Sequence, residues 1–290
     1  MKSTVAIARD DDIGASVTGA LGLLGDLSGH FAGAHVAIKP NETMASSEDH
    51  TACTQPDTLR AVIRYVKGCR PGRITVSGGA GAGRTGEVMR VLGLDRVIEE
   101  EGVGFFDHNR PPFEAVALDY GPQEEVMVNP AVLDYDAVVS LSQLKVHDEA
   151  TVTLTMKNTA MSWPAADYYG YPRARKLHPH KFFKDLHGFI VGMCKRFPIT
   201  LGIIVGHPAM VGRGPIGGET FETGLTVAST DYVAADKVGS MILGIENVRH
   251  IEEAGALGLG RANLEDIEIV GLTLEGARSV FEEKRAGKLS

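Results

Sequence analysis

The apolar residues of this chain recur in short runs that alternate with amphipathic segments. The runs are rich in valine and isoleucine and are apolar on both sides of an extended chain, which is typical of strands buried in a parallel sheet. Residues common in turns bound each run. We therefore expect strands at 35–39, 73–77, 137–141, 200–205, 225–228 and 267–270.

Helical periodicity lies between these runs. Apolar residues repeat at spacings of three and four in Thr58–Val66 and in Asp231–Leu243. Asp57 and Asp231 suit a cap or first helical turn, and Asp236 suits a salt bridge within its helix better than catalysis. The charged tail at 275–290 is expected to form a surface helix. This order of strands and helices predicts an α/β fold whose parallel or mixed sheet has helices on both faces.

A joint between two lobes is expected near residue 125. The segment Gly121–Pro130 contains a glycine, two prolines and a pair of acids, and it separates regions of strand and helix pattern. We predict an N-terminal α/β lobe at 1–125 and a second α/β lobe at 126–290. A chain of 290 residues is long enough for this two-lobed arrangement.

Charge and composition narrow the function classes. The hydrophobic fraction of 43% and the charged fraction of 23% are those of a globular protein. The net charge of −8 gives no overall basic field for nucleic acid or an anionic membrane. An anionic substrate would need local positive charge, so we expect a small anion as partner and neither nucleic acid nor membrane; a homo-oligomer stays possible.

The cysteines and the first residues bear on compartment and cofactor. Three cysteines without a paired motif argue against a disulfide framework, a zinc knuckle or a cysteine-ligated iron–sulfur cluster. The opening MKSTVAIARDDD has no apolar signal region, and no apolar run reaches the roughly 18 residues of a membrane helix. We expect a cytoplasmic protein.

Two predicted strands end in residues suited to anion binding. Lys39-Pro40-Asn41 follows the first strand, and ligands of parallel α/β folds bind at the carboxyl ends of strands. The alternative is a turn with a solvated lysine. Ser77–Gly86 contains five glycines before a helix, the pattern of an anion nest, with Gly81, Gly83 and Arg84 as candidate contacts.

The same glycine loop allows a nucleotide interpretation. Gly81-x-Gly83-x-x-Gly86 satisfies the dinucleotide fingerprint, and Asp107 follows the next possible strand. That spacing alone is weak evidence, because the glycines do not follow the strand directly and Gly93 interrupts the helix early. The loop has no Gly-Lys-Ser/Thr ending, which excludes an ATP-type phosphate loop.

The densest candidate cluster combines Lys145, His147, Lys157 and Asn158. A lysine near other cations or in apolar surroundings loses its proton more easily and becomes a base or nucleophile, and a histidine passes protons near neutral pH. The alternative is a half-buried strand with surface lysines. If the segment is a strand, residues 145, 147 and 157 share one face; if it bends into a helix, they need not.

Two further segments carry candidate ligands. In Gly212–Gly218, Arg213, Gly214 and Gly217 follow a strand and suit an anion, or else form a surface loop. The basic stretch at 173–187 contains His178 and His180, which are weak metal candidates because no acid or thiol lies at ligand spacing. A solvated loop explains that stretch better.

Several segments together resemble the domain-of-unknown-function family 362. They are VAIKPN at 36–41, Thr54-Gln-Pro56, the glycine loop, LKVH with TMKN at 144–158, GRGPIGG, and AST-DYVAAD at 228–236. The resemblance implies an α/β enzyme-like fold and a site around Lys145, His147, Lys157 and Asn158, with Thr54 nearby. Many members carry an iron–sulfur segment that this chain lacks. Gly206-His207 stands where the family often has an acid.

A fainter likeness is to the lactate racemase superfamily. In that family a histidine precedes, by ten residues, a lysine that carries a nickel-pincer nucleotide, and His147 and Lys157 have this spacing. The glycine loop lacks the histidine that the superfamily places there, so the likeness is an analogy only.

These patterns favour a small-molecule enzyme over other classes. We expect it to bind a carboxylate or phosphate through Lys39, Asn41, Arg213 and the glycine loops, with Lys157 as base or covalent anchor and His147 as proton shuttle. Isomerisation, elimination or ring closure suits these residues better than hydrolysis. A nucleotide-dependent oxidoreductase and a non-catalytic protein that carries a cofactor or metal are the alternatives, and the cofactor stays open.

Overall fold

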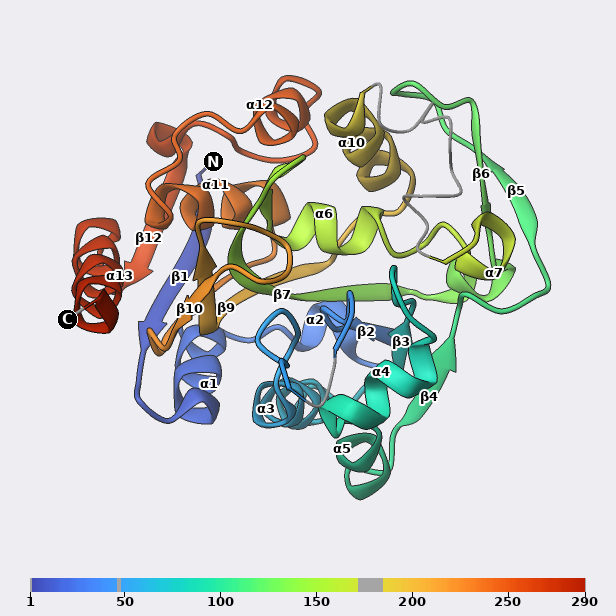
Figure 1. The fold of residues 1–290 in the computed structure, drawn as a ribbon, viewed down its shortest axis with the longest axis horizontal. Coiled ribbons are helices and arrows are strands. Elements are labelled where there is room, and N and C mark those ends of the chain that lie inside the picture. Colours follow the sequence, from blue (N-terminus) through green and yellow to red (C-terminus); the bar gives the residue numbers. More distant parts are fainter. Residues whose placement is uncertain (1, 46–47, 172–184, 290) are drawn as a thin grey trace.

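The computed structural model describes residues 2–45, 48–171 and 185–289, and its centre is one mixed sheet (Figure 1). In the described residues this sheet has ten strands, ordered β12-β1-β11-β9-β7-β2-β3-β4, with β10 beside β9 and β8 beside β7. The strands are β1 Ser3–Arg9, β2 His35–Lys39, β3 Arg73–Gly78, β4 Gly104–Asp107, β7 Ala137–His147, β8 Thr151–Thr153, β9 Leu201–Val211, β10 Glu219–Phe221, β11 Leu225–Ser229 and β12 Ile267–Gly271. A separate hairpin pairs β5 Glu114–Ala117 with β6 Glu125–Val128.

The predicted α/β class with a mixed sheet is confirmed. Strands β9, β7, β2, β3 and β4 run parallel, whereas β11 is antiparallel to both of its neighbours. Each of the six expected runs is a strand. Two of them run six residues beyond the expected end: β7 continues past 141 to His147, and β9 continues past 205 to Val211.

Helices cover both faces of the sheet (Figure 1). On one face, apolar residues of α1, α3, α4 and α5 pack with β2, β3 and β7; on the other, those of α6, α10, α11 and α12 form a second core. The bounds are α1 Ile13–Leu23, α2 Ser28–Phe31, α3 Pro56–Gly68, α4 Thr85–Leu92, α5 Leu94–Glu100, α6 Thr155–Ala160, α7 Ala166–Tyr169, α10 Leu186–Arg196, α11 Tyr232–Ile242, α12 Arg249–Ala256 and α13 Leu274–Leu289, with 3₁₀ turns at Pro130–Asp134 and Leu264–Asp266.

The helix starts follow from local chemistry. Asp231 caps α11, where its Oδ1 accepts a hydrogen bond from the backbone N–H of Ala234 at 3.0 Å. Pro56 and Asp57 stand in the first turn of α3, a proline position and an acid position that favour a helix start. Of the two positions expected from the sequence, Asp231 is a helix cap and Asp57 is an acid in the first turn of its helix.

The order of strands reverses beside β2. The chain passes from β2 to β3 to β4 in one direction, and then places β7 on the other side of β2 with β9 beyond it. In open α/β sheets, the crevice outside the carboxyl ends of the strands at such a reversal is the usual ligand site. The sheet takes strands from both sides of residue 125, and the division into two lobes there stays a prediction.

Candidate functional site

A cavity of about 350 Å³ opens at the carboxyl end of β2, where the strand order reverses. Its wall is built from the segment after β2, the glycine loop after β3, the end of β7, helix α6 and the loop after β9. Seven residues expected from the sequence line it: Lys39, Asn41, Gly81, His147, Lys157, Asn158 and Gly214.

The other candidates lie outside the cavity lining: Thr54, Gly83, Arg84, Lys145, Arg213 and Gly217. Arg213 is 80% exposed, and its Nε lies 3.9 Å from a carboxylate oxygen of Asp148. Thr54 is buried, and its hydroxyl accepts a hydrogen bond from the backbone N–H of Asn41 at 2.8 Å. Thr54 therefore shapes the segment that carries Asn41.

Lys145 lies in the core beside the cavity. Its Nζ donates to the carbonyl of Ala52 at 2.5 Å and to that of Pro215 at 3.5 Å. Complete burial lowers the pKa of Lys145 to about 8. These bonds connect β7 to two loops, so Lys145 positions the segments around the cavity.

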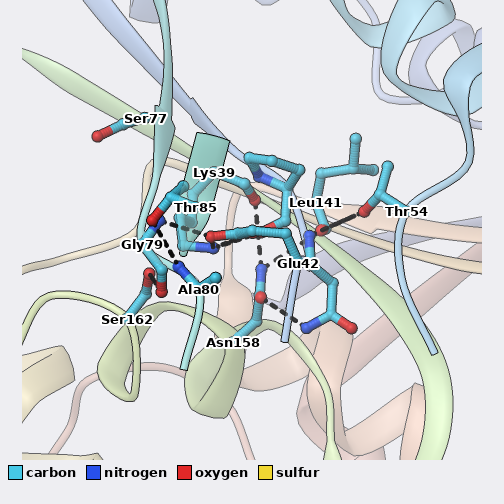
Figure 2. A network of polar contacts seen from close by, with 12 residues as sticks. Lys39, Glu42, Thr54, Ser77, Gly79, Ala80, Thr85, Leu141, Asn158 and Ser162 are labelled. Atoms are coloured by element: carbon cyan, nitrogen blue, oxygen red, sulfur yellow. Dashed lines mark hydrogen bonds and ion pairs between the residues drawn. The ribbon is translucent and has the colours of Figure 1, made fainter. Parts of the chain in front are cut away.

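An internal ion pair occupies the place where the sequence predicted a bound anion. Glu42 accepts from the Lys39 ammonium at 2.7 and 2.5 Å, and both side chains are buried. The same carboxylate accepts the backbone N–H of Gly79 at 2.7 Å (Figure 2). Glu42 therefore partners both Lys39 and the first amide of the glycine loop. Sequence reasoning missed Glu42, although it stands three residues after Lys39.

The ring of His147 is held by two hydrogen bonds from the backbone. Its Nδ1 accepts the backbone N–H groups of Glu149 at 3.1 Å and Ala150 at 3.2 Å. Nδ1 must therefore carry a lone pair, and the proton of the neutral ring stands on Nε2. Burial, followed by the charges of Lys157 and Lys145, lowers the pKa of His147 to about 2. The role of His147 as a proton shuttle stays a prediction, and the low pKa means that its ring does not take up a proton near neutral pH.

Helix α6 presents Lys157 and Asn158 to the cavity. The chain bends from β8 into α6 before Lys157, so the shared strand face does not apply. Asp236 of α11 caps the start of α6, accepting from the N–H groups of Thr155 at 2.8 Å and Met156 at 3.0 Å. Burial raises the pKa of Asp236 to about 7. Asp236 thus makes a helix cap, not the salt bridge expected from its sequence position.

The positive charge of Lys157 acts on two histidines. It lowers the pKa of His147, and it contributes with burial and His187 to lowering the pKa of His250 to about 3. His250 is buried and its Nδ1 lies 3.0 Å from Nδ1 of His187. Lys157 is therefore a positive charge close enough to act on both imidazoles, in a cavity wall that also contains the carboxylates of Glu42, Asp148 and Glu149.

A buried polar network supports the glycine loop from behind. The hydroxyls of Ser77 and Ser162 each lie 2.9 Å from a ring nitrogen of His108. Tyr135 donates to Ser77 at 2.9 Å. Ser162 donates to the carbonyl of Gly79 at 3.2 Å (Figure 2). A Cβ on Gly79 would lie 1.9 Å from Nε2 of His108, so this glycine is required by packing. Its contact with His108 spans 29 positions and leaves no pattern in the sequence.

Of the residues that the nucleotide interpretation needs, Gly81 lines the cavity and Asp107 does not. Asp107 accepts from the N–H of Asn109 and from Arg110. Within the part of the chain that the structure describes, no group of three or more His, Cys, Asp or Glu side chains is arranged to hold a metal ion. His178 and His180 lie outside the described residues. Among the described helices, none combines the length and the apolar character needed to cross a membrane.

Comparison with known proteins gives a family and a distant relative. A family model described as a domain of unknown function, DUF362, matches residues 36–241, which include every residue of the cavity wall. The chain is 28% identical over 224 residues to a thylakoid-associated protein of Synechocystis sp.. That similarity covers 74% of this chain and 64% of the relative, so the chain spans less than two thirds of the relative's length.

Proposed function

The chain belongs to the domain-of-unknown-function family DUF362, as its motifs predicted, and we propose from its cavity that it is an enzyme acting on a small anion. The substrate is a carboxylate or phosphate, and the reaction is a proton transfer of the isomerase, lyase or cyclase type. The observation that carries this proposal is the pairing of Lys157 with a neutral, Nε2-protonated His147 in the wall of one cavity.

Binding of the anion rests on local charge. The chain as a whole carries −8, so attraction of an anion depends on a local positive charge, which in this cavity is that of Lys157 on α6. The charge of Lys157 reaches His147 and His250, because it adds to the effect of burial in lowering the pKa of both. Lys39 is already compensated by Glu42, so its role is to hold the glycine loop in place.

The proton transfer follows from the protonation states. A neutral imidazole whose N–H points at a substrate oxygen stabilises negative charge that develops there, as in an enolate, without giving up its proton. His147 is the proposed donor of that bond. Lys157 is the proposed base or covalent anchor. Its ammonium, which draws the anion in, must first give its proton to solvent; the neutral amine then takes a proton from the substrate or attacks it, and the ammonium that the proton transfer restores stabilises the anion so formed.

The oxidoreductase alternative has less support. A pyrophosphate on the glycine loop would meet the carboxylate of Glu42, which already accepts the N–H of Gly79. Gly83 and Asp107, which the fingerprint needs, do not line the cavity. A protein that only carries a cofactor or metal would bind its ligand without converting it. An experiment that measures binding and turnover separately distinguishes such a carrier from an enzyme.

The test combines binding and exchange. A panel of small carboxylates and phosphates, with nicotinamide nucleotides for comparison, is screened by thermal shift, and the compounds that bind are then incubated with the protein in D₂O. We expect binding and incorporation of deuterium by the wild type, with at least a tenfold loss of both in Lys157→Gln.

The matched control is Arg213→Gln, which removes an exposed cation that the sequence also nominated. It is expected to bind and exchange as the wild type does. Equal behaviour of Lys157→Gln and the wild type would refute the proposal, and binding without exchange would favour the carrier alternative.

A further inference from the structure

Two residues of the cavity wall each carry a buried polar atom that has no hydrogen-bond partner among the described residues. These atoms are Oδ1 of Asn41 and Oγ1 of Thr153, whose residues are 3% and 2% exposed. Both residues line the cavity together with Lys157. Buried polar groups are nearly always hydrogen-bonded, so an exception in a ligand cavity needs an explanation.

The orientation of Asn158 is set by backbone carbonyls. Its Nδ2 donates to the carbonyl of Lys39 at 3.2 Å and to that of Leu141 at 3.3 Å (Figure 2). These acceptors cannot donate in return, so the opposite amide orientation would place Oδ1 against two carbonyl oxygens. Oδ1 of Asn158 must therefore face Asn41.

The orientation of Asn41 follows from that of Asn158. Nδ2 of Asn41 donates to Oδ1 of Asn158 at 2.9 Å, and a flipped Asn41 would bring two oxygens together. The backbone of Asn41 is held as well, because its N–H donates to the buried hydroxyl of Thr54. The amide atom of Asn41 that is left without a partner is consequently the acceptor Oδ1. Its direction is fixed by the hydrogen bonds that run from the carbonyls of Lys39 and Leu141 through Asn158 to Asn41.

We propose that the ligand of this cavity carries a hydrogen-bond donor, a hydroxyl or an amine, in addition to its anionic group. Asn41 Oδ1 accepts from that donor, and the hydroxyl of Thr153 makes a second polar contact. This inference rests on the proposed function, in which the anionic group is held at Lys157, and it narrows the substrate class. An analogue that lacks the donor leaves the Asn41 acceptor buried and unpaired, which sites of this kind discriminate against strongly.

Matched pairs of probes test the inference. Dissociation constants are measured by calorimetry or ligand-observed NMR for glycerol 3-phosphate against propyl phosphate, and for 3-hydroxybutyrate against butyrate. The 3-aminobutyrate ion distinguishes an amine from a hydroxyl donor. We expect at least one donor-bearing probe to bind the wild type tenfold or more tightly than its partner, and Asn41→Leu to reduce that ratio below threefold.

Thr153 provides a second variant that does not depend on the relay. Thr153→Val removes only an unpartnered hydroxyl, so its melting temperature should equal or exceed that of the wild type while affinity for the preferred probe falls several-fold. Thr153→Ser keeps the hydroxyl and is expected to retain the affinity. This pair decides the question even if Asn41→Leu fails to fold.

The two proposals fail in different ways. If both members of every pair bind the wild type equally and Lys157→Gln abolishes that binding, the donor inference is overturned and the proposed function stands. If no probe binds, or Lys157→Gln binds as the wild type does, the proposed function fails and the donor inference fails with it.

Discussion

At the scale of single residues, the protonation state of His147 limits the chemistry that can be proposed for the cavity. Two backbone N–H groups point at its Nδ1, and burial beside Lys157 keeps the ring neutral. A histidine in this state polarises a substrate oxygen but does not take up a proton near neutral pH. The base must then be another group, which is why the proposal assigns that role to Lys157.

The first prediction concerns the tautomer of His147. In protein labelled with ¹⁵N-histidine, the ring of His147 should remain neutral with its proton on Nε2 from pH 8 to pH 5, because its folded-state pKa is about 2. Nitrogen chemical shifts report this directly. A titration of His147 near its ordinary value of about 6.5 would show that the site is wetter than the structure implies.

At the scale of elements, helix α6 depends on a residue from another helix. Asp236 of α11 accepts three hydrogen bonds at the start of α6, from two backbone N–H groups and the hydroxyl of Thr155. The six-residue helix makes too few internal bonds to hold itself, so this cap sets the direction in which Lys157 points.

The second prediction follows from this cap. Asp236→Ala should lower the free energy of unfolding by about 1–3 kcal/mol, because it leaves buried donors unpaired, and should also weaken anion binding by at least tenfold. Asp231→Ala is the control, since it removes the cap of α11 without touching α6. It should lower stability and leave affinity unchanged. If both variants bind as the wild type does, α6 does not position the site.

Part of the fold and of the candidate site could be predicted from the sequence. The strand runs, the capped α11 and the crowding of candidates at the carboxyl end of β2 could be predicted, because each depends on neighbours in the chain. His108 could not, because its partners come from other segments. Glu42 could be predicted only in part, because its ion pair with Lys39 is local whereas its bond with the N–H of Gly79 is not. The sequence predicts Lys145 as a site residue because a lysine side chain can serve as a base or nucleophile. Its position in the core depends on the carbonyls of two distant loops, which accept hydrogen bonds from its Nζ.

At the scale of the whole molecule, buried neutral histidines link the site to acid stability. His147 and His250 have folded-state pKa values of about 2 and about 3, below the value of about 6.5 for an unfolded histidine. Below pH 6.5 the unfolded chain therefore binds protons that the folded chain does not. Stability is retained above pH 6.5 and is lost as the pH falls from there towards 3.

The third prediction tests this linkage with His250→Gln. Each such histidine removes up to about 1.4 kcal/mol of stability per pH unit in this window, so the variant should lose less stability than the wild type between pH 6.5 and pH 4. Urea unfolding at several pH values measures the difference. The exposed His30→Gln should match the wild type. A parallel loss in His250→Gln and the wild type would mean that His250 is protonated in the folded state.

The most direct test of the account is a crystal structure of the protein grown with a high concentration of phosphate or with the tightest anion from the screen. We predict density for the anion in the cavity at the end of β2, with one oxygen within hydrogen-bond distance of Lys157 Nζ and another beside Nε2 of His147. Density for the anion only at the exposed Arg213 loop, with the cavity filled by ordered water alone, would contradict the central claim that this cavity is an anion site.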